Sequence, residues 1–216
     1  MKSTTSINPN FDEHIVTEDD IWSVSHIDTS KMFLVNDEGS GGQIYAESPN
    51  SAFCYKIQRS PMENASPVAK AHVKAQGLRE IANCIEYSNS GITPTFHGVV
   101  VTEDGRLGHG MEFMPSLRLL NHMPKEELRL WESRIREFEA YMISLGIGVL
   151  GDFELGAVSA VEGQDIDVFD PSTCRMVLID LTSLHKLSEM GNSIEDAIAR
   201  NHQSFDIYLY NRMNSY

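Results

Sequence analysis

The sequence predicts an α+β fold with two lobes, the first rich in β-strands and the second mainly helical. Short apolar runs separated by turn residues fill residues 31–58 and 96–114. A long apolar stripe with helical spacing begins only after Pro124. At 216 residues the chain has room for two small lobes that share a cleft. We expect a polar leader over 1–28, a first lobe over 29–115 and a second over 116–216.

The first lobe is predicted to open with three strands. The runs "KMFLV", "QIYAE" and "AFCYKI" within residues 31–58 carry the β-branched and aromatic residues that strands favour, and a glycine turn separates the first two. Residues 66–88 begin with Ser-Pro and continue with apolar residues at near-helical spacing, which predicts a helix. The segments "FHGVVVT" and "LGHGMEFM", joined by "EDGR", indicate a hairpin.

The clearest helix of the chain is predicted over residues 125–146. Its apolar positions form one stripe, and Gly146 is a suitable residue to end it. The stripe consists of Leu128, Trp131, Ile135, Phe138, Met142 and Leu145. Two short strands, "DIDVFD" and "RMVLID", are expected next, joined by the turn "PSTC". The tail from Ser193 indicates one more helix, ending "FDIYLYNRM".

Composition and charge exclude several classes of function. Acidic residues outnumber basic ones 31 to 17, which gives a net charge of −14. That charge repels nucleic acid and anionic lipid, so neither is an expected partner. The longest apolar runs are too short for a membrane span, and the N-terminus lacks the apolar core of a Sec signal peptide. The three cysteines lie far apart among apolar neighbours, which favours buried thiols in a reducing compartment.

The glycine-rich stretch "EGSGGQIY" poses the main question about function. Taken alone, it favours an ordinary turn between strands. Two later residues change the interpretation. Ile44 comes just after the glycines, and Lys56 lies on the strand after that. A phosphate-binding glycine loop precedes its lysine in this same order. Glycines there let backbone N–H groups approach phosphates closely. The candidate nucleotide-binding residues are Gly39, Ser40, Gly41, Gly42, Ile44, Lys56, Met111, Glu112 and Met114, the last three from "MEFMP".

Such a lysine needs a carboxylate from the helix that comes after it. Glu80 is the best candidate, since it lies in the middle of the predicted helix over 66–88. An ordinary solvated helix glutamate is the simpler alternative, and Glu86 is a second candidate for the same role. Lys56 itself is either a charge on an edge strand or a lysine in a cleft, and the preceding glycine loop favours the cleft.

Two carboxylates stand out in the second half of the chain. Asp180 ends the apolar run Met176–Ile179, a place where a charge needs a partner, a metal ion or water. Asp152 comes after the long helix in "GDFE", where a turn aspartate is nearly as good an interpretation on local sequence alone. Its position between the helix and the expected strand pair favours a functional role.

These motifs, in this order, resemble the protein-kinase-like superfamily, and more narrowly the minimal OspG- and NleH-like effector kinases that bacterial pathogens inject into host cells. The resemblance covers about residues 30–216 and rests on "EGSGGQIY", "CYK", "GDFE", "IDVFDPSTCRMVLIDLTS" and "SFDIYLYNRM". It implies a Ser/Thr protein kinase that uses ATP and Mg²⁺, is secreted into the host cytoplasm and phosphorylates a host protein. Lys56, Glu80 and Asp152 would then be catalytic, and Asp180 would hold the metal.

Departures from the family pattern leave some assignments open. Leu150-Gly151 replaces His-Arg before Asp152, Asp37 replaces the first loop glycine, and Asp180-Leu181-Thr182 replaces Asp-Phe-Gly. Ala157 stands where an asparagine should bind the second metal ion. We infer an insertion after "GDFELGAV", so that Asp165 or Asp167 takes that role. In an alternative register Asp165 is the catalytic aspartate and Asp152 is structural.

The stretch from Leu181 to Tyr216 is too short for a complete kinase C-lobe with an activation segment. The resemblance therefore implies that another surface recognises the substrate, or that a host protein activates the enzyme. Two further functions stay open. One is a small-molecule phosphotransferase of the aminoglycoside or choline kinase type, which shares the fold and the "GDF" element. The other is a kinase fold without catalysis that serves as a binding module.

Overall fold

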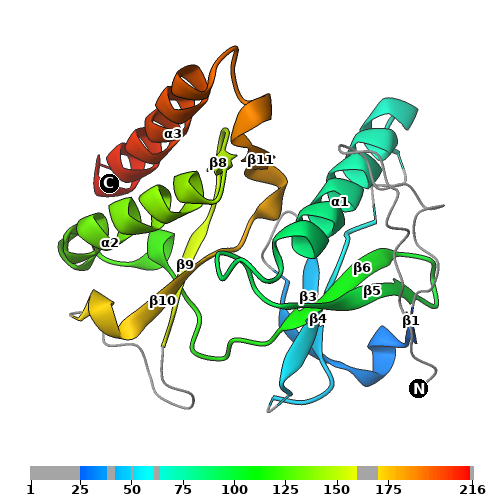
Figure 1. Ribbon diagram of the computed structural model, residues 1–216. Coiled ribbons are helices and arrows are strands. Elements are labelled where there is room, and N and C mark those ends of the chain that lie inside the picture. The colour runs from blue at the N-terminus through cyan, green and yellow to red at the C-terminus, as the bar shows by residue number, and fades with distance from the viewer. Residues whose placement is uncertain (1–24, 38–41, 50, 61–63, 160–169, 215–216) are drawn as a thin grey trace. The chain divides into compact units, whose positions relative to one another are not determined.

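The computed structural model describes residues 25–37, 42–49, 51–60, 64–159 and 170–214 (Figure 1). It confirms the mixed α+β class, with a multi-stranded sheet on the N-terminal side of two long helices. The chain divides into two compact units. Unit 1 comprises residues 1–89 and 94–114, and unit 2 comprises residues 90–93 and 115–216. Among the described helices, none is both long and apolar enough to cross a membrane.

Unit 1 is built on a mainly antiparallel sheet in the order β1-β5-β6-β4-β3-β2. Its strands are β1 (Ser25–Ile27), β2 (Phe33–Asn36), β3 (Gln43–Ala46), β4 (Phe53–Ile57), β5 (Phe96–Thr102) and β6 (Leu107–Glu112). The three strands predicted within 31–58 and the predicted hairpin are confirmed, with ends shifted by up to two residues. The unpredicted strand β1 pairs in parallel with β5, a partner more than 70 positions away in the sequence.

Helix α1 (Pro67–Tyr87) is the helix predicted over 66–88 and packs on β5 and β6. Ser66 caps it by accepting a hydrogen bond from the Ala69 N–H at 3.1 Å, and Pro67 occupies the first turn, where its missing N–H costs nothing. The buried face, which includes Leu78, Ile81 and Cys84, lies in the C-terminal half of the helix. That half is therefore the part of α1 that the core of unit 1 holds in place.

Unit 2 combines two helices with short strands. The elements are β7 (Arg118–Leu119), α2 (Lys125–Ser144), β8 (Ile147–Val149), β9 (Leu155–Ser159), β10 (Cys174–Leu178), β11 (Leu184–Lys186) and α3 (Ile194–Asn214). Short 3₁₀ turns of unit 2 stand at Leu120–His122, Pro171–Thr173, Leu181–Ser183 and Leu187–Glu189, and unit 1 has one at Thr29–Lys31. The strands form two small sheets, in the orders β10-β9-β7 and β11-β8. Helices α2 and α3 pack side by side (Figure 1).

Helix α2 confirms the predicted apolar stripe in all but its last position. Leu128, Trp131, Ile135, Phe138 and Met142 are buried, whereas Leu145 is 42% exposed. The helix has ended by Leu145, so this side chain no longer follows the helical period. Gly146 ends the helix with a φ of 75°, a left-handed conformation that favours glycine. The helix predicted from Ser193 is also confirmed, as α3.

Of the predicted strand pair, "RMVLID" is present as β10, whereas "DIDVFD" lies outside the described residues except for its last residue, Asp170. Strand β10 pairs with residues 155–159, which form β9, in the register Leu155 to Leu178 and Ser159 to Cys174. Asp170 is not in a strand but caps the turn Pro171–Thr173, and residues 165–169 lie outside the described residues. Strand β9 is the middle strand of its sheet, so its apolar run is continuous and lacks the alternation of a half-exposed strand.

Candidate functional site

In unit 1, Lys56 and Glu80 form a buried ion pair. Lys56 lies on β4, between strands β3 and β6, and Glu80 lies on the buried half of α1. The Lys56 Nζ donates to Glu80 Oε1. The side chains are 16% and 6% exposed, so both charges are largely removed from water and attract each other strongly. The predicted pairing is thus present, while the alternative candidate Glu86 is exposed.

His109 and Cys84 extend this cluster, and the sequence analysis missed both. His109 is directly opposite Lys56 in the β4–β6 ladder, and its Nε2 lies 3.4 Å from Cys84 Sγ on α1. Burial, and to a lesser degree the charge of Lys56, lowers the pKa of His109 from 6.5 to about 3. Burial also raises the pKa of the Cys84 thiol. The groups next to the ion pair are therefore neutral, and the cluster holds one cation against one anion.

Gly42 lets the chain pass close to Lys56. A Cβ on Gly42 would lie 2.7 Å from the Ile57 carbonyl oxygen and 3.3 Å from Lys56 Cγ, so any other residue would push the strands apart. Ile44 faces Lys56 across the β3–β4 ladder. The remaining predicted loop residues, Gly39, Ser40 and Gly41, lie outside the described residues.

The segment "MEFMP" ends unit 1. Met111 and Glu112 close strand β6, and unit 1 finishes at Met114, which is buried. The Glu112 N–H donates to Thr95 O at 2.8 Å, and the Phe113 N–H donates to Ala52 O at 3.1 Å. The Glu112 carboxylate accepts from the Thr95 N–H and hydroxyl. Two backbone N–H groups of this candidate nucleotide-binding segment are thus already hydrogen-bonded within unit 1.

In unit 2, Asp180 caps the turn Leu181–Ser183 at the end of β10. Its Oδ1 accepts from the Thr182 N–H at 3.1 Å and from the Thr182 hydroxyl at 2.6 Å. Both hydrogen bonds fall on this one oxygen, and the residue is partly exposed. Asp180 therefore has a structural role as a cap, and its other carboxylate oxygen can serve a ligand.

The loop that carries Asp152 is tied at both ends to the segment that carries Asp180. The Leu150 N–H donates to Ser183 O at 3.1 Å, and the Ile179 N–H donates to Glu154 O at 2.9 Å. Asp152 lies between these two ties and is exposed. The two candidate carboxylates thus stand on neighbouring segments at the same end of the β9–β10 pair.

Helix α3 supports the Asp152 loop from the other side. Phe153 is buried against the rings of Phe205 and Tyr208, with centroids 4.8 and 4.7 Å away. The fully buried Asn201 accepts from the Val149 N–H at 2.8 Å, on the strand that leads into the loop. Burying Phe153 turns its neighbour Asp152 towards solvent. The tail helix is therefore what positions this loop.

Glu154 is a further candidate that sequence reasoning passed over. Its Oε2 accepts from Asn121 Nδ2 at 2.6 Å, and its buried Oε1 has no hydrogen-bond partner among the described residues. Burial raises the pKa of Glu154 from 4.5 to about 6, and the charge of Asp180 adds to the rise, against the opposing charge of Arg212. The only signal in the sequence was its place in "GDFE".

The expected second metal ligands cannot be placed, because Asp165 and Asp167 lie outside the described residues. Ala157 is buried in β9, where it pairs with Met176. The segment that contains both aspartates joins β9 to β10 at the Ser159–Cys174 end of the ladder, about 13 Å along the strands from the Leu178 end. Their assigned roles stay predictions. Within the described ranges, no group of three or more His, Cys, Asp or Glu side chains is arranged to hold a metal ion.

In comparisons with known proteins, no family model matches this chain, and no curated protein matches it either. Arguments about function therefore rest on the residues themselves. Unit 1 offers a cation held by a buried carboxylate beside a close-packed glycine. Unit 2 offers two carboxylates on segments that are tied together.

Proposed function

We propose that this chain is an ATP-dependent Ser/Thr protein kinase of the minimal effector type, which uses Mg²⁺ and phosphorylates a host protein after secretion into the host cell. The observation that carries the proposal is the buried ion pair between Lys56 and Glu80. A lysine on the second strand after a glycine turn, paired with a glutamate of the next helix, is the arrangement that protein kinases use to hold the α- and β-phosphates of ATP.

The cost of burial argues that the pair is more than a surface contact. Removing two charges from water costs several kcal/mol per ion, and their attraction offsets this only in part. Hydrophobic residues of similar size would hold β4 and α1 together at least as well. A largely buried lysine that is paired with a carboxylate is well suited to bind an anion, because a phosphate of the ligand adds negative charge next to the cation.

Asp152 and Asp180 have separate roles in this proposal. Asp152 would accept a hydrogen bond from the attacking hydroxyl and orient it, which suits an exposed carboxylate on a loop held at both ends. Asp180 would supply a carboxylate oxygen to Mg²⁺. The metal ion would neutralise charge on the transferring phosphoryl group.

The residues that the structure describes fit a magnesium ion that the substrate helps to bind. Mg²⁺ takes oxygen ligands and is usually held by one or two carboxylates together with the phosphates of the nucleotide. Asp180 offers such an oxygen at a partly exposed strand end. A site of this kind does not need three protein ligands within the described ranges.

The test is transfer of label from γ-labelled ATP in the presence of Mg²⁺, with the chain alone, with host-cell lysate, and with small alcohols such as choline or an aminoglycoside. Label on protein that disappears in Asp180→Asn would support the proposal. Label on small molecules only would favour a small-molecule phosphotransferase. If ATP with Mg²⁺ produces neither transfer nor a thermal shift, the chain is a binding module and the proposal fails.

A further inference from the structure

Among the described residues, strand β10 is an edge strand, and one part of its outer edge has no partner there. The pairing strand on its other side is β9. Alternate residues of a strand direct their N–H and C=O groups to opposite sides. The Ile179 N–H bonds Glu154 O on the β9 side, whereas the Leu178 N–H bonds Ile92 O on the outer side at 2.7 Å. At the start of the strand, Cys174 O accepts from Arg134 Nη2 at 3.2 Å.

Met176 lies midway between these two occupied positions. The alternation that directs Leu178 and Cys174 outward also directs the N–H and C=O of Met176 outward. From the described residues, no hydrogen bond reaches either group on that side. Met176 is only 4% exposed, so its two backbone groups have little access to water. Unpaired backbone groups in such a place are rare, and they indicate a partner that completes them.

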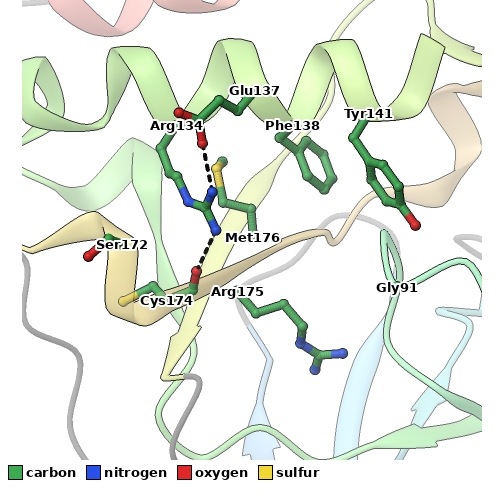
Figure 2. A pocket seen from close by; sticks show the side chains of 9 residues that line it. All are labelled: Gly91, Arg134, Glu137, Phe138, Tyr141, Ser172, Cys174, Arg175 and Met176. Atoms are coloured by element: carbon green, nitrogen blue, oxygen red, sulfur yellow. Dashed lines mark hydrogen bonds and ion pairs between the residues drawn. The ribbon is translucent and has the colours of Figure 1, made fainter. Parts of the chain in front are cut away.

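A pocket of about 390 Å³ lies between α2 and this part of β10 (Figure 2). Its size is that of a site for a small ligand or a few side chains. Phe138 and Met176 provide a buried apolar part, and the ring of Tyr141 provides a half-exposed one. The further lining residues are Gly91, Arg134, Glu137, Ser172, Cys174 and Arg175.

Two arginines give the pocket a charge opposite to that of the whole chain. Arg134 comes from α2 and Arg175 from β10, and the lining residues include one acidic side chain, that of Glu137, in a protein of net charge −14. Arg134 is held rigidly, because Nη1 bonds Glu137 Oε2 at 2.7 Å and Nη2 bonds Cys174 O. Its Nε is buried and has no hydrogen-bond partner in the described part of the chain. A fixed guanidinium with an unused donor favours a carboxylate ligand.

We propose that the pocket binds a short extended peptide segment of a partner protein, in which an apolar side chain is flanked by acidic residues. The segment adds to the edge of β10 through the N–H and C=O of Met176. The apolar side chain packs against Phe138 and Tyr141, and the acidic groups pair with the arginines. The outward groups of Cys174 and Leu178 are occupied and lie about 13 Å apart along the strand, so the part between them, centred on Met176, takes two or three residues of the partner. The proposal does not depend on phosphoryl transfer.

Fluorescence anisotropy of the full chain tests this, with a fluorescein-labelled hexapeptide of alternating aspartate and leucine as the probe. Arg175→Glu should weaken binding about tenfold or more, because it replaces an attraction by a repulsion. The matched control is Arg200→Glu on α3, which does not line the pocket and should leave the affinity unchanged. A probe with N-methylated leucines should also lose affinity, since it cannot donate to the strand edge.

Two further measurements test the proposal without the Arg175→Glu variant, in case this variant folds poorly. Hydrogen exchange of the wild-type chain should slow at the N–H of Met176 when the aspartate-leucine peptide binds, because this is the donor that the peptide newly engages. A lysine-leucine peptide should bind the wild-type chain far more weakly than the acidic one. Equal binding of the acidic and basic peptides, full binding of the N-methylated peptide, or no binding at millimolar concentration would overturn the proposal.

Discussion

His109 lies directly opposite Lys56 in the β4–β6 ladder and stays neutral because it is buried beside that charge. A protonated imidazole here would place a second cation next to the lysine, and Glu80 alone would not balance both. The ion pair thus has a neutral histidine as its neighbour, and this histidine forms no part of the predicted motif.

We expect His109 to make the folded state sensitive to acid. The pKa of His109 is about 3 in the folded chain and 6.5 in the unfolded chain. The free energy of unfolding is therefore highest above pH 6.5 and decreases as the pH falls towards 3. Between pH 6.5 and 5 the loss amounts to about 2 kcal/mol. His109→Gln should flatten this part of the curve of unfolding free energy against pH, as measured by urea titration. His72→Gln, an exposed control on α1, should leave the slope unchanged.

Breaking the ion pair of unit 1 should cost more than replacing it. Lys56→Met leaves the Glu80 carboxylate buried without its partner, which should destabilise the fold by about 3–5 kcal/mol. The double variant Lys56→Met/Glu80→Leu should recover most of this loss, because well-packed apolar residues substitute for a buried ion pair. Urea unfolding of both variants checks the prediction, and equal stability of the two would contradict it.

The same double variant separates stability from nucleotide binding. If Lys56 contacts the phosphates, the refolded double variant should show no thermal shift with ATP and Mg²⁺, although its fold is intact. A surface control, Arg200→Met, removes a half-exposed partner of Asp196 and should cost less than about 1 kcal/mol without changing the thermal shift. Normal ATP binding by the double variant would remove the lysine from the proposed site.

Asp180→Asn should abolish phosphoryl transfer and leave the fold unchanged. The amide oxygen can still accept from Thr182, so the cap of the turn survives, whereas the negative charge needed for Mg²⁺ is lost. Asp170→Asn is a closely matched control, because Asp170 caps the preceding 3₁₀ turn through Ser172 in the same way. Transfer activity should fall at least a hundredfold in the first variant only. A similar loss in both would point to a structural cause.

Asp152→Asn should reduce transfer about a hundredfold or more while ATP binding persists, as expected for a residue that orients the hydroxyl. Asp165→Asn should have a much smaller effect on the rate. The ties from Leu150 to Ser183 and from Ile179 to Glu154 favour this order, because they hold Asp152 on the segment next to Asp180. Single-turnover rates for the two variants show which aspartate orients the hydroxyl. A larger loss in Asp165→Asn would establish the alternative register.

Glu154→Gln should stabilise the chain at neutral pH. The pKa of Glu154 is raised from 4.5 to about 6, so the unfolded state loses its proton first and the stability falls as the pH rises through this interval. Over this interval the free energy of unfolding falls by about 2 kcal/mol. Glutamine keeps an acceptor for Asn121 and should remove this loss. Thermal melting at pH 4.5 and 7 checks it, with the exposed Glu132→Gln as the control.

Local patterns predicted much of the fold. The spacing of apolar residues and the Ser-Pro start located α1, and the stripe from Leu128 to Met142 located α2. The pairing of Lys56 with Glu80 was also predictable from their order along the chain. The partner of β10 was not, because the apolar run of residues 155–159 lacks the alternation that marks a half-buried strand.

The sequence by itself determined where the helices and most strands of this protein lie, since caps, turns and apolar periods act between residues a few positions apart. Only the tertiary structure decided which distant groups meet. It put His109 beside Lys56, tied Ile179 to Glu154, and, among the described residues, gave the outer edge of β10 no partner at Met176. These contacts form only when whole helices and strands pack together. The local sequence around each residue contains no pattern that predicts its distant partner.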